Sequence, residues 1–161
     1  MNNIEKLKQI LKKHKIKCKL IKHEKKLIRS DDLKDKNVTK EDVCKTIILK
    51  TRNKNYLAVC LKGEDRVDTK KVKESIGKKV DVATHENVEK STGLKVGEVC
   101  PLLVKMPIII DKKVLERDEL HFGSGDLYYD LIINPKDLEK AITFKIADIR
   151  KDGWRESNFQ K

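Results

Sequence analysis

The sequence predicts an α+β (mixed α/β) domain in which a mainly antiparallel, barrel-like mixed sheet is flanked by short helices. Its apolar runs, for example residues 46–49 and 107–110, have the length of β-strands. Two pairs of such runs are separated by short turns, which predicts β-hairpins. Helical segments fall between the strands in irregular order, so strict alternation of strands and helices is not expected. The 161 residues are enough for one domain, residues 1–161.

The chain is expected to begin with a basic amphipathic helix at about residues 3–14. Apolar residues recur there at helical spacing, and lysines occupy the other face. Residues 16–22 then alternate, with Ile16, Cys18 and Leu20 on one side, which predicts a half-buried strand. Residues 24–38 are polar and charged, and they predict a loop.

A β-hairpin is predicted after this loop. Thr39 is suited to begin a short helix, because two acidic residues follow it in the first turn. Residues 45–50 are rich in residues that favour strands, and residues 53–55 are typical of a turn. Residues 56–61 then provide the second strand of the hairpin.

Short helices and further strands complete the predicted domain. Asp68 and Thr84 are suited to cap helices that Gly77 and Gly93 would end, and Pro135 is suited to the first turn of another helix. The remaining strands are expected at residues 79–83, 107–111, 120–125, 128–133 and 143–149, and a polar tail is expected at about residues 150–161.

The composition favours a folded, basic protein. Hydrophobic residues make up 38% and charged residues 40% of the chain, and the formal net charge is +12. Residues 1–26 hold ten lysines and two acids, so most of the excess charge lies at the start. Such a charge suits a polyanionic partner. Compositional bias of the genome or a hot habitat would also enrich lysine, and both explanations stay open.

Several function classes are excluded by missing motifs. No apolar stretch is long enough to cross a bilayer and no secretory signal is present, so a cytoplasmic protein without a membrane partner is expected. The four cysteines are widely spaced and predict free thiols. No metal-ligand spacing, phosphate-binding glycine loop or nucleophile elbow occurs. We therefore expect no metal and no cofactor.

Two features are unusual for a purely structural domain. Lys45 opens an apolar strand directly after a short helix, and Gly97-x-x-x-Pro101 encloses an apolar filling between residues that shape the backbone. Taken alone, the first is explained by a surface lysine whose stem covers apolar groups, and the second by an ordinary turn.

Together with the surrounding sequence motifs, these features resemble a known family. The motifs are Lys45-Thr46-Ile47-Ile48, Tyr56-Leu57-Ala58-Val59, Ser91-Thr92-Gly93-Leu94-Lys95-Val96-Gly97-Glu98-Val99-Cys100-Pro101, Pro107-Ile108-Ile109-Ile110-Asp111 and Ala147-Asp148-Ile149. Their order and approximate spacing resemble the YbaK/prolyl-tRNA synthetase-associated family of aminoacyl-tRNA editing domains. The resemblance runs from about residue 16 to about residue 149, and it implies a YbaK-like fold.

The resemblance implies a free-standing trans-editing deacylase that hydrolyses the ester of a mischarged tRNA. Family substrates are cysteinyl-, alanyl-, seryl- and threonyl-tRNAs, with tRNA(Pro) favoured, and no cofactor is required. The residues implied for catalysis are Lys45, Gly97, Glu98, Val99, Cys100 and Pro101. Those implied for substrate binding are His23, Thr46, Gly123, Ser124 and Asp130.

Two departures from the family pattern concern substrate choice. Cys100 stands where serine is usual, and the order Gly123-Ser124-Gly125 differs from the Ser-Gly-Gly of the cysteinyl-specific branch. Because contacts near the substrate side chain set specificity, both departures weaken a cysteinyl assignment. The sequence does not choose among the amino acids.

The basic start of the chain has two interpretations. It could contact acceptor-stem phosphates, or it could be a solvated helix face. The candidate tRNA-binding residues are Lys12, Lys13, Lys15, Lys17 and Lys19. An aminoacyl-tRNA is the expected partner, and an aminoacyl-tRNA synthetase is a second candidate partner. The alternative function is a non-catalytic tRNA- or synthetase-binding module of the same fold. A general basic RNA-binding protein would explain the charge but not the glycine-shaped loop.

Overall fold

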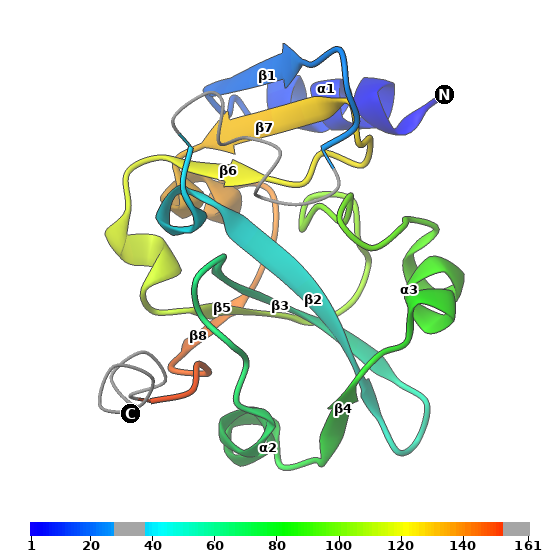
Figure 1. Cartoon of the computed structure of the whole chain (residues 1–161), viewed down its shortest axis with the longest axis vertical. Helices are drawn as coiled ribbons and strands as arrows, with labels where there is room; N and C mark the ends of the chain where they lie inside the picture. The colour runs from blue at the N-terminus through cyan, green and yellow to red at the C-terminus, as the bar shows by residue number, and fades with distance from the viewer. Residues whose placement is uncertain (28–37, 153–161) are drawn as a thin grey trace.

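The computed structural model describes residues 1–27 and 38–152 and contains two open β-sheets with short helices around them (Figure 1). The strand order is β1-β7-β6 in the smaller sheet and β4-β2-β3-β5-β8 in the larger one. The helices are α1 (Asn3–Lys13), α2 (Thr69–Ile76) and α3 (His85–Thr92), with 3-10 helices η2 (Lys40–Asp42), η3 (Val114–Glu116) and η4 (Pro135–Lys140). The strands are β1 (Cys18–Lys22), β2 (Cys44–Thr51), β3 (Tyr56–Lys62), β4 (Val80–Val82), β5 (Ile108–Asp111), β6 (Leu120–Phe122), β7 (Tyr129–Ile133) and β8 (Lys145–Ala147).

The predicted α+β class with a mixed, mainly antiparallel sheet is confirmed. The β2–β3, β2–β4, β1–β7 and β6–β7 pairs are antiparallel, whereas β3–β5 and β5–β8 are parallel. The barrel-like part of the prediction takes a more open form, since neither sheet of the described chain closes into a barrel. The polar tail falls largely outside the described residues, as does most of the loop predicted at 24–38.

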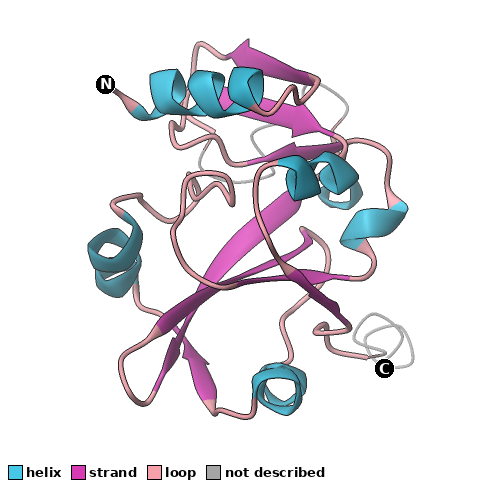
Figure 2. Ribbon diagram, turned by 180° about the vertical axis from the view of Figure 1, so that it is seen from behind, coloured by secondary structure: helices cyan, strands magenta, loops and turns pink. Residues whose placement is uncertain are grey.

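The smaller sheet lies beside α1, which Figure 2 shows across its back. Leu7 and Leu11 of α1 enter the same core cluster as Leu131 and Ile133 of β7. One expectation for this region is wrong, because Cys18 is exposed. β1 lies at the edge of its sheet and starts only at this residue. On the predicted buried side, Ile16 is buried in the core just before the strand and Leu20 is partly buried.

The larger sheet separates two hydrophobic clusters. One face of β2 and β3 contributes Ile48, Ala58 and Cys60 to the cluster shared with the smaller sheet. The other face contributes Leu49 and Val59 to a second cluster that includes α2. Successive residues of a strand point to opposite faces, so the alternation along β2 decides which side chains can reach the space between the sheets.

The predicted helix ends are confirmed where the sequence supplies capping residues. The carboxylate of Asp68 accepts hydrogen bonds from the first turn of α2, and the hydroxyl of Thr84 does the same for α3. Gly77 and Gly93 follow these helices in the left-handed conformation. The helix expected at Pro135 is of the 3-10 type, and the short helix η3 was not predicted. No helix in the described part of the chain has both the length and the apolar character to cross a membrane.

The start of β2 is held in place by an ion pair. Arg117 donates from Nη2 to Asp42 Oδ1 at 2.8 Å and from Nη1 to the carbonyl oxygen of Glu41 at 2.6 Å. The other Asp42 oxygen accepts the N–H of Thr39 at 2.9 Å. These contacts join η2 to the segment after η3, and they therefore position the residues with which β2 begins.

We expect the contribution of this ion pair to stability to disappear in acid. The Arg117 hydrogen bond lowers the pKa of Asp42 from its ordinary value of 3.8 to about 2. Because the folded-state pKa is the lower one, the contribution is complete above about pH 5 and is lost as the pH falls through 3.8 toward 2. Both side chains are partly exposed, so Asp42→Asn should cost about 1 kcal/mol at pH 6. Urea unfolding of both proteins at pH 6 and near pH 2 tests this, and an equal difference at the two pH values would contradict it.

Candidate active site

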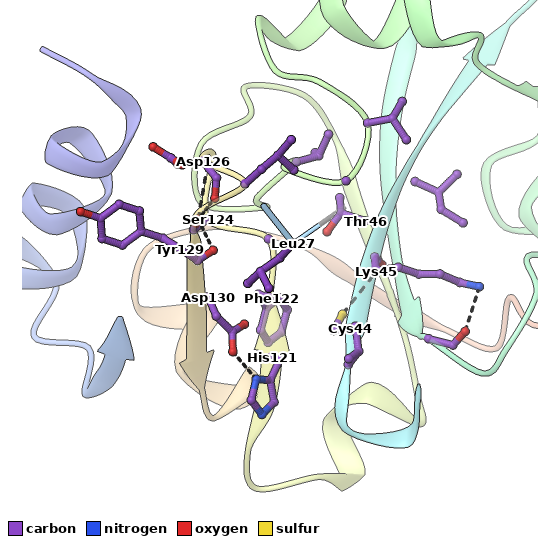
Figure 3. A pocket seen from close by; sticks show the side chains of 18 residues that line it. Leu27, Cys44, Lys45, Thr46, His121, Phe122, Ser124, Asp126, Tyr129 and Asp130 are labelled. Atoms are coloured by element: carbon purple, nitrogen blue, oxygen red, sulfur yellow. Dashed lines mark hydrogen bonds and ion pairs between the residues drawn. The ribbon is translucent and has the colours of Figure 1, made fainter. Parts of the chain in front are cut away.

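A pocket of about 330 Å³ opens between the two sheets (Figure 3). Its walls come from the start of β2, the end of β6, the start of β7 and the loop around Gly97. Pockets of this size can bury a small ligand group. Seven of the predicted site residues line it, namely Lys45, Thr46, Gly97, Val99, Gly123, Ser124 and Asp130.

The other predicted residues lie elsewhere. Glu98, Cys100, Pro101 and His23 are not part of the pocket lining. His23 is buried just after β1, where its N–H donates to the carbonyl oxygen of Tyr128 at 2.7 Å. The five candidate tRNA-binding lysines are exposed at the end of α1, in the segment that follows it and on β1, and they do not line the pocket either.

Lys45 and Thr46 point to opposite faces of the larger sheet. Thr46 lies on the pocket side, where its hydroxyl is 3.6 Å from the Cys60 sulfur. The ammonium of Lys45 donates to the carbonyl oxygens of Gly63 and Asp65, and Figure 3 shows the side chain directed away from the pocket interior. Burial lowers the pKa of Lys45 below its ordinary value, although the nearby Asp65 carboxylate opposes this effect. Lys45 is thus at the rim of the pocket with its charge on the outer side.

The loop that carries Gly97 is held by reciprocal hydrogen bonds. The N–H of Lys95 donates to the Glu98 carboxylate at 2.7 Å, and the N–H of Glu98 donates to the Lys95 carbonyl at 3.0 Å. Gly97 has φ +93°, a conformation that glycine adopts readily. Within residues 1–27 and 38–152, the N–H groups of Gly97 and Val99 have no hydrogen-bond acceptor. Both residues line the pocket, so their N–H groups are candidate donors to a ligand.

Cys100 and Pro101 anchor this loop in the protein interior. Cys100 is fully buried within the core cluster, and burial raises the pKa of its thiol to about 12. The thiol therefore stays protonated at neutral pH and is a poor nucleophile. Glu98 contributes to the loop through its side-chain hydrogen bond rather than through a contact with the pocket.

A second turn packs directly against the loop. A Cβ atom added to Gly123 would lie 2.5 Å from the carbonyl oxygen of Val99, so no side chain fits there without movement. The N–H of Gly125 donates to the carbonyl oxygen of Glu98 at 2.8 Å. The hydroxyl of Ser124 is occupied within the turn, because it lies 2.8 Å from the carbonyl oxygens of both Asp126 and Tyr129. Ser124 is therefore a structural residue of the pocket wall.

His121 is a pocket residue that sequence reasoning missed. Its Nδ1 is hydrogen-bonded to Asp130 Oδ2, and the two side chains lie on neighbouring strands β6 and β7. Asp130 is only 5% exposed. The predicted strand at 120–125 already placed residues 121 and 123 on one face. The pairing with Asp130, however, depends on the register between two strands, which the sequence pattern alone does not give.

The described residues contain no group of three or more His, Cys, Asp or Glu side chains arranged to hold a metal ion. The chemistry that the pocket can offer consists of the free backbone donors of the loop, the Lys45 ammonium at its rim and the His121–Asp130 pair on the opposite wall.

Comparison with known proteins shows the family and the fold of the chain. A family model described as an aminoacyl-tRNA editing domain matches residues 29–141. The crystal structure of the hypothetical protein APE2540 is 24% identical, with a TM-score of 0.85, and the match covers 91% of this chain and 99% of that one. A protein described as a candidate trans-editing enzyme for prolyl-tRNA synthetase is 17% identical, with a TM-score of 0.80, and the match covers 94% and 98% of the two chains. At these identities the two structures show a common fold.

Proposed function

The chain belongs to the aminoacyl-tRNA editing domain family, and on this premise we propose that it is a trans-editing deacylase that hydrolyses mischarged tRNA. The proposed substrates are tRNA(Pro) species carrying Ala, Cys, Ser or Thr. The observation that carries the proposal is the rigid loop at the pocket, where the N–H groups of Gly97 and Val99 have no acceptor within the described chain. The structural neighbour described as a candidate trans-editing enzyme supports it as well.

The free donors of the loop suit ester hydrolysis. Water attacks the ester carbonyl carbon, and the carbonyl oxygen becomes an oxyanion. The ester C–O bond then breaks, the tRNA 3′-terminal ribose oxygen takes a proton from the attacking water, and the free amino acid leaves. Backbone N–H groups fixed near the developing oxyanion lower the barrier for this reaction. An aminoacyl ester is already reactive, so this pocket needs no nucleophilic side chain.

Lys45 is proposed to hold the 3′ end of the tRNA at the rim. Its ammonium has three N–H groups, of which two are engaged by the carbonyl oxygens of Gly63 and Asp65. The third is available to a phosphate or ribose oxygen. Because the side chain lies on the outer side of β2, it fits the nucleotide part of the substrate better than the aminoacyl group inside the pocket.

The exposed lysines between the end of α1 and β1 are proposed to contact acceptor-stem phosphates. Phosphate contacts add affinity without sequence information and make binding sensitive to salt. An aminoacyl-tRNA synthetase remains a candidate partner for delivery of the substrate. Charging and editing of tRNA would place the protein in the cytoplasm.

We expect the purified protein to hydrolyse at least one mischarged tRNA(Pro) in a panel charged with Ala, Cys, Ser, Thr or Pro, and to spare Pro-tRNA(Pro). Lys45→Ala should slow this hydrolysis about tenfold, the loss typical of one hydrogen bond to a charged group. Lys50→Ala, on the same strand and partly buried, is the matched control and should keep the activity. Loss of the radiolabelled amino acid from tRNA over time measures the rate.

Two outcomes would contradict the proposal. No hydrolysis of any species, with tRNA binding intact, would favour the non-catalytic binding module. Equal activity of Lys45→Ala and Lys50→Ala would keep the deacylase but remove Lys45 from the substrate contacts, leaving it to hold the segment around Gly63 and Asp65.

A further inference from the structure

The pocket has a charge opposite to that of the protein as a whole. The chain carries a net charge of +12, yet the pocket lining contains two carboxylates, Asp126 and Asp130, and only one lysine. The ammonium of that lysine, Lys45, is directed away from the pocket interior (Figure 3). The Asp126 carboxylate is engaged by the N–H of Tyr128 at 2.8 Å, and Figure 3 shows it directed away from Asp130. Asp130 is therefore the carboxylate that defines the charge of the pocket interior.

One oxygen of the Asp130 carboxylate is open to a ligand. Oδ2 is hydrogen-bonded to His121 Nδ1, which fixes the side chain against β6. Oδ1 has no hydrogen-bond partner among the residues that the structure describes. The Asp130 side chain is only 5% exposed, yet Oδ1 is not one of the fully buried side-chain atoms that lack a partner in the described residues. This oxygen is therefore open to the pocket, where a donor of the ligand can reach it.

The position of Asp130 relative to the loop limits what this donor can be. Phe122 pairs with Leu131 between β6 and β7, so Gly123 lies beside Asp130 at the next step. Gly123 in turn packs against the backbone of Val99. Asp130, Gly97 and Val99 thus line the same pocket of about 330 Å³. A small ligand that fills this pocket would contact the carboxylate with one group and the loop with another.

An aminoacyl ester carries such a donor. Its α-ammonium is attached to the carbon next to the carbonyl carbon, and it has a positive charge and three N–H groups. We propose that Asp130 Oδ1 accepts a hydrogen bond from the substrate's α-ammonium, and that the pocket thereby selects esters of free α-amino acids. His121 is the positioning residue that holds Asp130. This inference rests on the proposed deacylase function, and it identifies the α-ammonium as the part of the substrate that the pocket recognises.

The charges of the two regions then match the two parts of one molecule. The basic surface suits the polyanionic tRNA, whereas the carboxylate in the pocket suits the single cation of the aminoacyl group. A charge-assisted hydrogen bond in a mostly buried site is stronger than one between neutral groups. The contact would also orient the carbonyl, since the ammonium and the carbonyl carbon are only two bonds apart.

The test compares the hydrolysis rate of each aminoacyl-tRNA that the protein cleaves with the rate for the corresponding α-hydroxyacyl-tRNA. The hydroxy ester is made by nitrous acid deamination, which converts alanyl-tRNA(Pro) into lactyl-tRNA(Pro). Rates are divided by the spontaneous hydrolysis rates, because the ammonium itself activates the ester. We expect the wild type to prefer the amino ester by about tenfold or more after this correction. Asp130→Asn should slow hydrolysis of the amino ester about tenfold and change hydrolysis of the hydroxy ester by no more than about twofold. The preference for the amino ester would then disappear.

His121→Ala should reduce the preference less than Asp130→Asn does, because it leaves the carboxylate in place but not oriented. Thermal unfolding and tRNA binding of each variant control for folding. An equal loss on both esters in Asp130→Asn, or a wild type without preference, would overturn the inference while the deacylase function stands. Absence of hydrolysis of every panel species would instead remove the deacylase function and this inference with it. The wild-type comparison decides the matter even if a variant does not fold.

Discussion

Asp111→Ala is expected to lower the free energy of unfolding by about 3 kcal/mol, the lower end of the usual cost of removing one partner of a buried ion pair, because only the carboxylate of this pair is completely buried. Asp111 ends β5 and is completely buried. Its carboxylate accepts the N–H of Ile149 at 2.9 Å and that of Lys113 at 3.1 Å. It also pairs with the guanidinium of Arg150 at 3.3 Å.

The effect is large because one completely buried carboxylate satisfies several donors at once. Without it, the N–H groups of Ile149 and Lys113 lose their acceptor, and Arg150 is left with Asp148 as its ion-pair partner. An unsatisfied buried donor costs about 1–3 kcal/mol. A small domain has a total stability of about 5–15 kcal/mol, so this single change removes much of it.

Urea unfolding monitored by circular dichroism measures the loss. The matched control is Asp148→Ala, which removes a carboxylate that contacts the same Arg150 at 3.2 Å but is 39% exposed. It should cost about 1 kcal/mol or less. Equal losses in the two variants would show that burial of Asp111 is not what makes it important.

Much of the fold could be predicted because local signals coincide with element ends. The capping carboxylate of Asp68 and the left-handed Gly77 define α2 by interactions within a few residues, and they form as expected. The exposure of Cys18 could not be predicted in the same way. Alternation shows that a strand has two faces, but whether either face is covered depends on where the strand lies in its sheet.

In the candidate site, too, local features could be predicted from the sequence, whereas contacts between distant segments could not. The glycine-shaped loop is local, and its Gly97 has the positive φ that favours glycine. The direction of Lys45 follows from strand alternation, which places it on the face opposite to Thr46, but the carbonyl oxygens that bind its ammonium come from a distant turn. The His121–Asp130 pair depends on the register of two strands in the folded sheet. Contacts between distant segments are what the sequence pattern leaves open.

Gly123→Ala is expected to lower the deacylation rate about a hundredfold while tRNA binding stays within about twofold. The new Cβ atom would lie 2.5 Å from the Val99 carbonyl oxygen and 3.2 Å from the carbonyl carbons of Glu98 and Val99. The loop must therefore move by several tenths of an ångström or more. Displacement of catalytic groups by about 1 Å can cost about a hundredfold in rate, because the donors no longer meet the oxyanion.

The rate must be separated from stability, since overpacking of this kind also costs about 1–3 kcal/mol. Gly77→Ala is the control: Gly77 has φ +74° and no atom within 4 Å of an added Cβ, so alanine there is strained but displaces nothing. It should lose about 1 kcal/mol of stability and keep its deacylation rate. Full turnover by Gly123→Ala would mean that the loop tolerates displacement, and the backbone donors of Gly97 and Val99 could then not be the groups that stabilise the oxyanion.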